Sequence, residues 1–151
     1  MKEEKNKNPL LKWIILAVAV AAAAFYLFFS DNPKVRLADD QLRIYTTFTY
    51  VNIDYSEIND LEIEEILVIG SRTSMGADAF FSRSGTFVNY KFGIYDMYSY
   101  KNVDKYIVVH HNKGIAVFNL KDEQETVDFY VLFRQNLRRL GVLQGEDEIE
   151  A

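Results

Sequence analysis

An uncharged, strongly apolar stretch near the N-terminus constrains this chain more than any other feature of its sequence. The 18 residues from Trp13 to Ser30 include no charged side chain. As an α-helix that rises about 1.5 Å per residue, they would extend over about 27 Å, close to the thickness of a hydrocarbon core. Aromatic residues at both ends, Trp13 and those within 25–29, are typical of the membrane–water interface. The stretch therefore predicts one N-terminal transmembrane helix at 13–30.

The sequence leaves open an alternative to this anchor. This alternative is a cleaved signal peptide, because Ala17 and Ala19 offer small residues at suitable spacing. Cleavage there would leave an exposed apolar terminus.

The orientation of the helix in the membrane follows from basic residues, which accumulate on the cytoplasmic side of a span. The segment 1–12 carries four lysines, against three basic residues in 34–43. We expect a single-pass protein of the cell membrane, with a cytoplasmic N-terminus and an extracytoplasmic domain.

Composition excludes several classes of function. A length of 151 residues allows one ordinary domain in addition to the helix. The absence of cysteine excludes a disulfide scaffold, a thiolate-ligated metal site and a cysteine nucleophile. The net charge of −5 argues against non-specific binding of nucleic acid, which requires clustered Lys and Arg. We expect no cofactor and no nucleic-acid partner.

A β-rich domain is expected to follow the helix. Alternating apolar residues, with many β-branched and aromatic side chains, predict about seven strands. These strands are expected near 42–44, 50–55, 58–63, 85–92, 94–100, 106–110 and 115–120. The predicted organisation is a short basic tail (1–12), the transmembrane helix (13–30), a linker (31–40), the domain (41–141) and an acidic tail (142–151).

The periodicity changes after the last predicted strand. Asp122 is a suitable N-cap, and Glu125 three residues later completes a capping box. An apolar stripe then follows at spacings of three and four: Tyr130, Phe133, Leu137 and Leu140. Gly141 is well placed to end the helix in a left-handed conformation. The pattern predicts one C-terminal amphipathic helix.

Spaced glycine, arginine and aromatic residues between 36 and 140 add a family resemblance. The positions that carry it are Gly70, Arg72, Gly76, Arg83, Gly85, Phe87, Gly93, Tyr95, the IVVHHNKGIAVFNL hairpin, Thr126 and Tyr130. In these positions the chain resembles a bacterial pleckstrin-homology (PH-like) domain family found in membrane-anchored proteins. The resemblance implies a mainly β fold, a PH-like barrel or sandwich of about seven strands capped by one α-helix, and association with a membrane. It implies no particular ligand.

The segment 70–86, GSRTSMGADAFFSRSGT, is the most unusual part of the domain. It predicts a long loop between strands, where binding residues often lie. In the functional interpretation, Arg72 and Arg83 form a fork for a carboxylate or phosphate, and Phe80 and Phe81 contact acyl chains or the apolar side chains of a partner. In the structural interpretation, the arginines pair with carboxylates of the domain and the phenylalanines pack inward. The sequence favours the structural interpretation.

The remaining motifs do not indicate catalysis. Consecutive residues His110 and His111 point to opposite faces of a strand, so the two imidazoles do not readily share one metal ion. The chain has no Gly-x-Ser-x-Gly nucleophile elbow, and the glycines of 70–86 lack the ending of a phosphate-binding P-loop. We therefore expect a protein that is not an enzyme, with no catalytic residue and no metal site.

The sequence favours a single-pass, membrane-anchored binding or interaction module. It would present a barrel surface and the 70–86 loop to a protein or peptide partner. The alternative is a domain that binds lipid headgroups or other anionic ligands with Arg72, Arg83 and Lys91 next to the bilayer. The candidate partner-binding residues are Arg72, Phe80, Phe81, Arg83 and Lys91.

Overall fold

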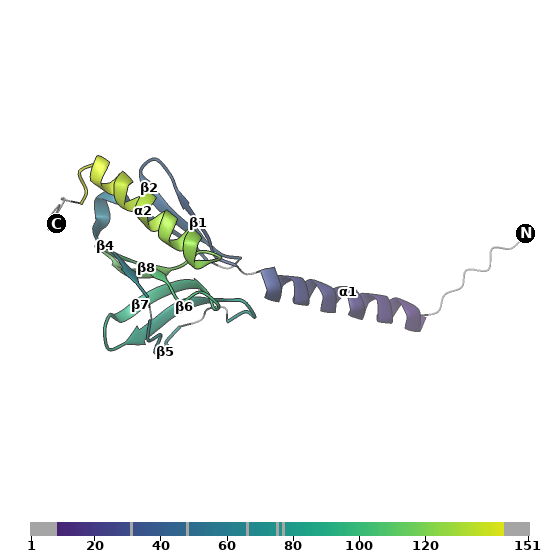
Figure 1. The fold of residues 1–151 in the computed structure, drawn as a ribbon. Coiled ribbons are helices and arrows are strands. Elements are labelled where there is room, and N and C mark those ends of the chain that lie inside the picture. Colours follow the sequence, from purple (N-terminus) through teal and green to yellow (C-terminus); the bar gives the residue numbers. More distant parts are fainter. Residues whose placement is uncertain are drawn as a thin grey trace, which may run out of the picture.

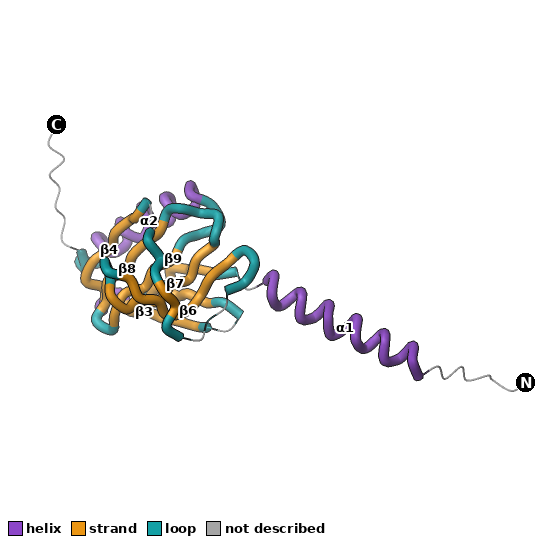
Figure 2. Tube along the Cα trace, turned by 90° about the horizontal axis from the view of Figure 1, so that it is seen from below, coloured by secondary structure: helices purple, strands orange, loops and turns teal. Residues whose placement is uncertain are grey.

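The computed structural model describes residues 9–30, 32–47, 49–65, 67–74, 76 and 78–143. A long helix, α1 (Pro9–Ser30), projects from one end of a domain of strands that finishes in a second helix, α2 (Glu123–Arg139) (Figure 1 and Figure 2). The strands are β1 (Lys34–Leu37), β2 (Gln41–Tyr45), β3 (Tyr50–Asp54), β4 (Ile58–Glu64), β5 (Ser71–Arg72), β6 (Ser82–Asn89), β7 (Gly93–Tyr100), β8 (Tyr106–His111) and β9 (Gly114–Phe118). The expectation of a mainly β fold with a C-terminal helix is confirmed.

Helix α1 is longer than the predicted span. It begins at Pro9, a residue suited to the first turn of a helix, and so includes Lys12. Its side chains are exposed as far as they are described, to Tyr26. Among the described residues it is one helix that is long and apolar enough to cross a membrane, a property that an N-terminal signal sequence shares. At about 1.5 Å per residue, its 22 residues extend over about 33 Å.

Two sheets make up the domain. Strands β1, β2 and β3 form an antiparallel sheet in that order, and six further strands form a second sheet in the order β4-β8-β9-β7-β6-β5. Neighbours in the second sheet are antiparallel except β7 and β9, which are parallel. Neither sheet closes on itself in the described part of the chain, so the closed seven-stranded barrel is not found there. The hairpins β6–β7 and β8–β9 turn where the sequence predicted, before Gly93 and Gly114.

Two of the strands were not predicted. Strand β1 lies in the segment expected to be a linker, and pairs along its whole length with β2, from Lys34 opposite Tyr45 to Leu37 opposite Leu42. Strand β5 lies at the start of the 70–86 loop, where Ser71 pairs with Val88 of β6. Both are short strands that form only by pairing with a neighbouring strand.

Apolar side chains form a cluster on each face of the six-stranded sheet. One cluster joins the two sheets and α2, which lies beside β1 and β2 in Figure 1. Its largest fully buried members include Leu42, Ile53, Phe118, Phe133 and Leu137. The other cluster lies on the opposite face and contains Phe87, Tyr95, Met97, Tyr106 and Val108. The domain is therefore held by helix packing on one side of this sheet and by aromatic side chains on the other.

The boundaries of α2 follow its sequence. The Asp122 carboxylate accepts a hydrogen bond of 2.8 Å from the backbone N–H of Glu125, which confirms the N-cap. The Glu125 carboxylate contacts the Lys121 ammonium at 2.9 Å. Gly141 has φ of 72°, and the N–H groups of Gly141 and Val142 donate to the carbonyls of the last helical turn, a Schellman ending.

One position of the predicted apolar stripe is wrong. Phe133 and Leu137 are fully buried, but Leu140 is half exposed because the chain leaves the helix there. Val142 packs against the core after the turn. The predicted acidic tail therefore begins with a residue that packs, and its residues 144–151 lie outside the described part, as do residues 1–8 of the basic tail.

Candidate functional site

The candidate loop 70–86 is partly ordered by contacts with β6. It starts with β5 and ends inside β6, and an isolated bridge pairs Asp78 with Arg83. Its backbone lies directly on β6: a Cβ on Gly76 would come within 2.1 Å of the Ser84 carbonyl oxygen and 2.7 Å of the Gly85 Cα. Glycine is required at position 76 because the two backbones approach so closely. Residues 75 and 77 of the loop lie outside the described part.

The two arginines of the loop make contacts within the loop. Arg72 Nη1 donates a hydrogen bond of 3.2 Å to the Gly76 carbonyl, and Arg83 Nε lies 3.8 Å from the Asp78 carboxylate. The Lys101 ammonium also pairs with Asp78, and this hydrogen bond is the main reason that the pKa of the Asp78 carboxyl is lowered. This arrangement agrees with the structural interpretation of the arginines.

Phe80 and Phe81 do not follow the structural interpretation, because neither packs inward. Phe80 is 61% exposed and Phe81 is 49% exposed. Their rings meet edge to face with centroids 4.8 Å apart. Two adjacent exposed phenylalanines on one loop form an apolar contact surface.

Lys91 is far from Arg83. It lies in the turn after β6, whereas Arg83 lies near the start of that strand. Arg83 and Asn89 are six positions apart along β6, which corresponds to about 20 Å. The Lys91 ammonium pairs with Glu64 of β4, and this contact is the main reason that the pKa of the lysine is raised. Arg72 and Arg83 thus share a loop, and Lys91 does not join them.

The two histidines lie on different sides of the sheet, as the sequence predicted. His110 faces the acidic side chains of β4, and its Nε2 lies 3.1 Å from Glu62 Oε1. Asp60 completes a group whose ligand-type atoms lie within 4.8 Å of one another, which is the chemistry of a candidate metal site. The sequence analysis missed this group, because a β-bulge between Ile58 and Asp60 sets Asp60 opposite His110. We assign the group to a polar contact between β4 and β8.

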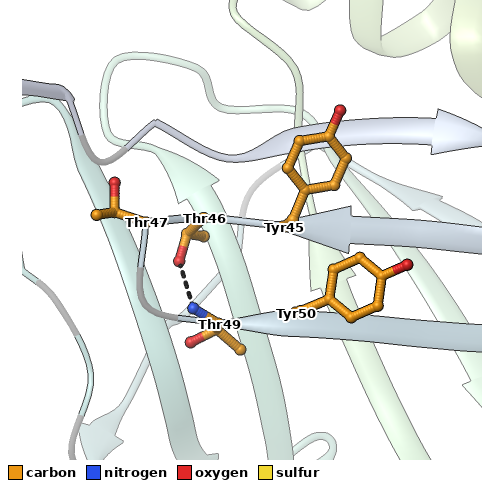
Figure 3. A pocket seen from close by; sticks show the side chains of 5 residues that line it. All are labelled: Tyr45, Thr46, Thr47, Thr49 and Tyr50. Atoms are coloured by element: carbon orange, nitrogen blue, oxygen red, sulfur yellow. Dashed lines mark hydrogen bonds between the residues drawn. The ribbon is translucent and has the colours of Figure 1, made fainter.

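A second aromatic pair, missed by the sequence analysis, lies at the tip of the smaller sheet. Figure 3 shows Tyr45 and Tyr50 pointing the same way from β2 and β3. Their centroids are 6.4 Å apart, and the rings line a shallow open hollow with three threonines of the connecting turn: Thr46, Thr47 and Thr49. The Arg36 guanidinium lies over the Tyr45 ring at 5.9 Å.

Both aromatic pairs lie at the end of the domain that follows α1. Lys34, four residues after the end of α1, is paired with Tyr45. The Tyr100 hydroxyl donates a hydrogen bond of 3.4 Å to the Pro33 carbonyl, and the next residue, Lys101, donates its backbone N–H to the Phe81 carbonyl at 2.9 Å. Aromatic side chains from the smaller sheet and from the loop before β6 therefore lie beside the segment that leaves α1.

Comparisons with family models, with curated proteins and with solved structures find no match to this chain. The residues of the site itself must therefore support any proposal about function.

Proposed function

We propose that the chain is a single-pass, membrane-anchored binding module without catalytic function, and that the 70–86 loop is its contact surface. The observation that carries the proposal is the exposed Phe80–Phe81 pair beside the segment that leaves α1. A helix with exposed apolar side chains along its length is stable when a bilayer surrounds it. The same anchor holds the contact surface close to the membrane.

We also propose that the domain is PH-like. Two packed β-sheets followed by one amphipathic helix that covers a shared core support this relationship. The open edges of the two sheets and the parallel pair β7–β9 are then departures from a closed barrel. This proposal concerns the fold and assigns no ligand.

The location follows from the charges on either side of α1. The four lysines of 1–12 favour a cytoplasmic N-terminus, so the domain lies on the extracytoplasmic side. Because the chain has no cysteine, Ser56→Cys introduces a single thiol at an exposed position remote from α1. Labelling of intact cells by a membrane-impermeant thiol reagent supports this orientation. Labelling only after lysis, with the lysed sample as the control for access, contradicts it.

A protein or peptide partner and the lipid surface both fit an exposed apolar pair. The alternative with Arg72, Arg83 and Lys91 as one anionic-ligand site has weaker support, because Lys91 lies at the other end of β6. Phe80 and Phe81 remain the residues that the geometry favours, with Arg72 and Arg83 organising the loop behind them.

A crosslinking experiment on the full chain tests the contact surface. A photoreactive amino acid replaces Phe80 in one variant and Tyr90 in the other. Tyr90 is the matched control because it is aromatic, 87% exposed and located at the opposite end of β6. Adducts that form in native membranes from position 80 and not from position 90 support the proposal. The same adducts from both positions would contradict it.

A further inference from the structure

The aromatic residues beside α1 come from two separate parts of the domain. Tyr45 and Tyr50 lie at the tip of the three-stranded sheet, and Phe80 and Phe81 lie on the loop before β6 of the other sheet. Both parts are tied to the segment that follows α1, through Lys34 and through Pro33. In Figure 1 the loops that lead into β6 and out of β7 lie on the side from which α1 projects.

Chain length limits how far these residues can be from the end of α1. Pro33 lies three residues after Ser30, and an extended chain covers at most about 3.5 Å per residue. Pro33 therefore lies within about 11 Å of the last residue of the helix. Because α1 is about as long as a hydrocarbon core is thick, a spanning α1 brings Ser30 to the membrane surface. The Tyr100–Pro33 contact then brings the neighbouring loop to the headgroup region.

The chemistry of these side chains fits that region. Aromatic rings concentrate at the membrane–water interface, where one part of the ring is apolar and a hydroxyl remains hydrated. Tyr50 is 61% exposed, similar to Phe80. In water the apolar surface of these rings is exposed to solvent, which is unfavourable. Insertion into the interface buries that surface. The hydroxyl groups of the threonine turn between β2 and β3 are suited to the same polar layer.

Charge is distributed along β1 and β2 in the same direction. Lys34 and Arg36 of β1 are exposed on the α1 side, next to the Tyr45 ring. The opposite end of β1 and β2 carries Asp39 and Asp40. The pKa of the nearby Tyr55 phenol is raised mainly by burial, and also by the negative charges of these two carboxylates. Anionic headgroups attract basic residues near their surface and repel acidic ones. Along β1 and β2, the basic residues thus lie toward α1 and the acidic pair lies away from it. The first turn of α2 adds one acidic side chain, Glu125, at the α1 end.

We propose that the bilayer itself occupies this surface: Tyr45, Tyr50, Phe80 and Phe81 lie in the interfacial layer of the membrane that α1 spans. This inference rests on the proposed anchor and names the partner of the same loop. Two contacts from two sheets, together with the helix, fix the tilt of the domain on the membrane. The domain then stands with its Asp39–Asp40 end directed into solution.

Depth measurements on the full chain in phospholipid nanodiscs test this inference. Four single-cysteine variants carry one polarity-sensitive fluorophore each: Phe80→Cys, Tyr50→Cys, Tyr90→Cys and Ala19→Cys. Tyr90 controls for the affinity of the dye for lipid, and Ala19, in the middle of α1, reports insertion of the anchor. The quenchers are phospholipids with a nitroxide at the headgroup end of the acyl chain for positions 80, 50 and 90, and at its methyl end for position 19. A water-soluble nitroxide serves in parallel.

We expect the lipid nitroxide to quench positions 80 and 50 at least about twofold more strongly than position 90, as for interfacial aromatic residues. Replacing Phe80 and Phe81 by serine in the Tyr50→Cys background should reduce the quenching of that label. The corresponding Tyr90→Ser change should leave it unaltered.

Each other outcome contradicts a defined part of the inference. If the lipid nitroxide quenches position 19 but quenches positions 80 and 50 no more than position 90, the transmembrane anchor is supported and the proposed bilayer contact is wrong. Protection of position 80 from both quenchers indicates a protein contact, from a partner or a second copy, and also overturns the bilayer assignment. If lipid does not quench position 19, the anchor fails and the inference fails with it.

Discussion

The buried side chain of Asn119 forms hydrogen bonds with both the backbone N–H and the backbone carbonyl of Tyr100. Its Oδ1 accepts a hydrogen bond of 2.7 Å from the Tyr100 N–H, and its Nδ2 donates to the carbonyls of Tyr100 at 3.2 Å and Val103 at 3.0 Å. Asn119 is fully buried, so no water can replace these bonds. One side chain thereby fixes the end of β7, where Tyr100 contacts Pro33 and Lys101 contacts Phe81.

The Asn119→Leu variant should therefore unfold more easily. Leucine is similar in size but leaves three backbone groups without their partner, and each unsatisfied buried group costs about 1–3 kcal/mol. We expect the free energy of unfolding to fall by about 3 kcal/mol. Denaturant unfolding of the full chain in detergent measures it. Gln135→Leu, on the exposed side of α2, should change it by less than about 0.5 kcal/mol. An equal loss in both variants would contradict the role of Asn119.

Gly76→Ala should displace the 70–86 loop from β6. The new methyl group would lie 2.1 Å from the Ser84 carbonyl oxygen, and two backbones cannot absorb such overlap without moving apart. We expect a loss of about 2–3 kcal/mol and faster proteolytic cleavage within the loop. Gly93→Ala is the control: its φ is 67° but no atom lies within 4 Å, so only conformational strain of about 1–2 kcal/mol applies. Cleavage of the loop at the rate of the unsubstituted chain would show that the close approach is not needed.

Removing the N-cap of α2 should weaken the packing of the helix. Asp122→Ala eliminates the acceptor for the Glu125 N–H and should lower the free energy of unfolding by about 1 kcal/mol. Asp122→Asn keeps a cap oxygen and should retain most of the stability. Thermal unfolding of the three chains by circular dichroism compares them. Equal melting temperatures for the Ala and Asn variants would exclude the cap as the cause.

His111 should make the domain less stable in mild acid. Burial is the main reason that the pKa of His111 is lowered, and the carboxylate of Glu57 opposes the effect. The unfolded imidazole, with an ordinary pKa near 6.5, binds a proton at a higher pH than the native one. The free energy of unfolding contributed by this group therefore decreases as the pH falls below about 6.5. Denaturation midpoints at pH 7.5 and pH 5.5 measure the decrease.

The His111→Gln variant supplies the comparison for this pH dependence. Carboxylates that titrate over the same range are present in both chains, so the difference between them isolates His111. We expect the decrease between the two pH values to be smaller in the variant. The same decrease in both chains would show that other groups produce it.

Local sequence patterns were sufficient for several elements. Helix α2 begins after Asp122 and ends before Gly141 because a cap and a left-handed stop depend only on neighbours within one turn. The β8–β9 hairpin follows from its turn residues for the same reason. Leu140 was predicted to be buried because it continues the spacing of the stripe. The chain leaves the helix there, and the structure buries Val142 in place of Leu140.

The short strands could not be predicted, because their stability comes from pairing. Residues 71–72 have no apolar alternation and become a strand only where β6 offers its edge. Residues 34–37 are too few to show a period, and the whole of β1 depends on β2. The group of Asp60, Glu62 and His110 likewise depends on a bulge and on the register of β4 with β8.

The sequence by itself determined the apolar helix, the β-rich character, the terminal amphipathic helix and the unusual loop with Phe80 and Phe81. Periodicity, caps and turns encode these features over a few residues. Only the tertiary structure decided that Lys91 stands apart from Arg83, and that Phe81 and Tyr45 both lie beside the exit of α1. Strand register and the Tyr100–Pro33 contact set these positions, and such pairings join residues up to 67 positions apart. No local pattern carries that information, because the free energy of each pairing arises only when both partners are in place.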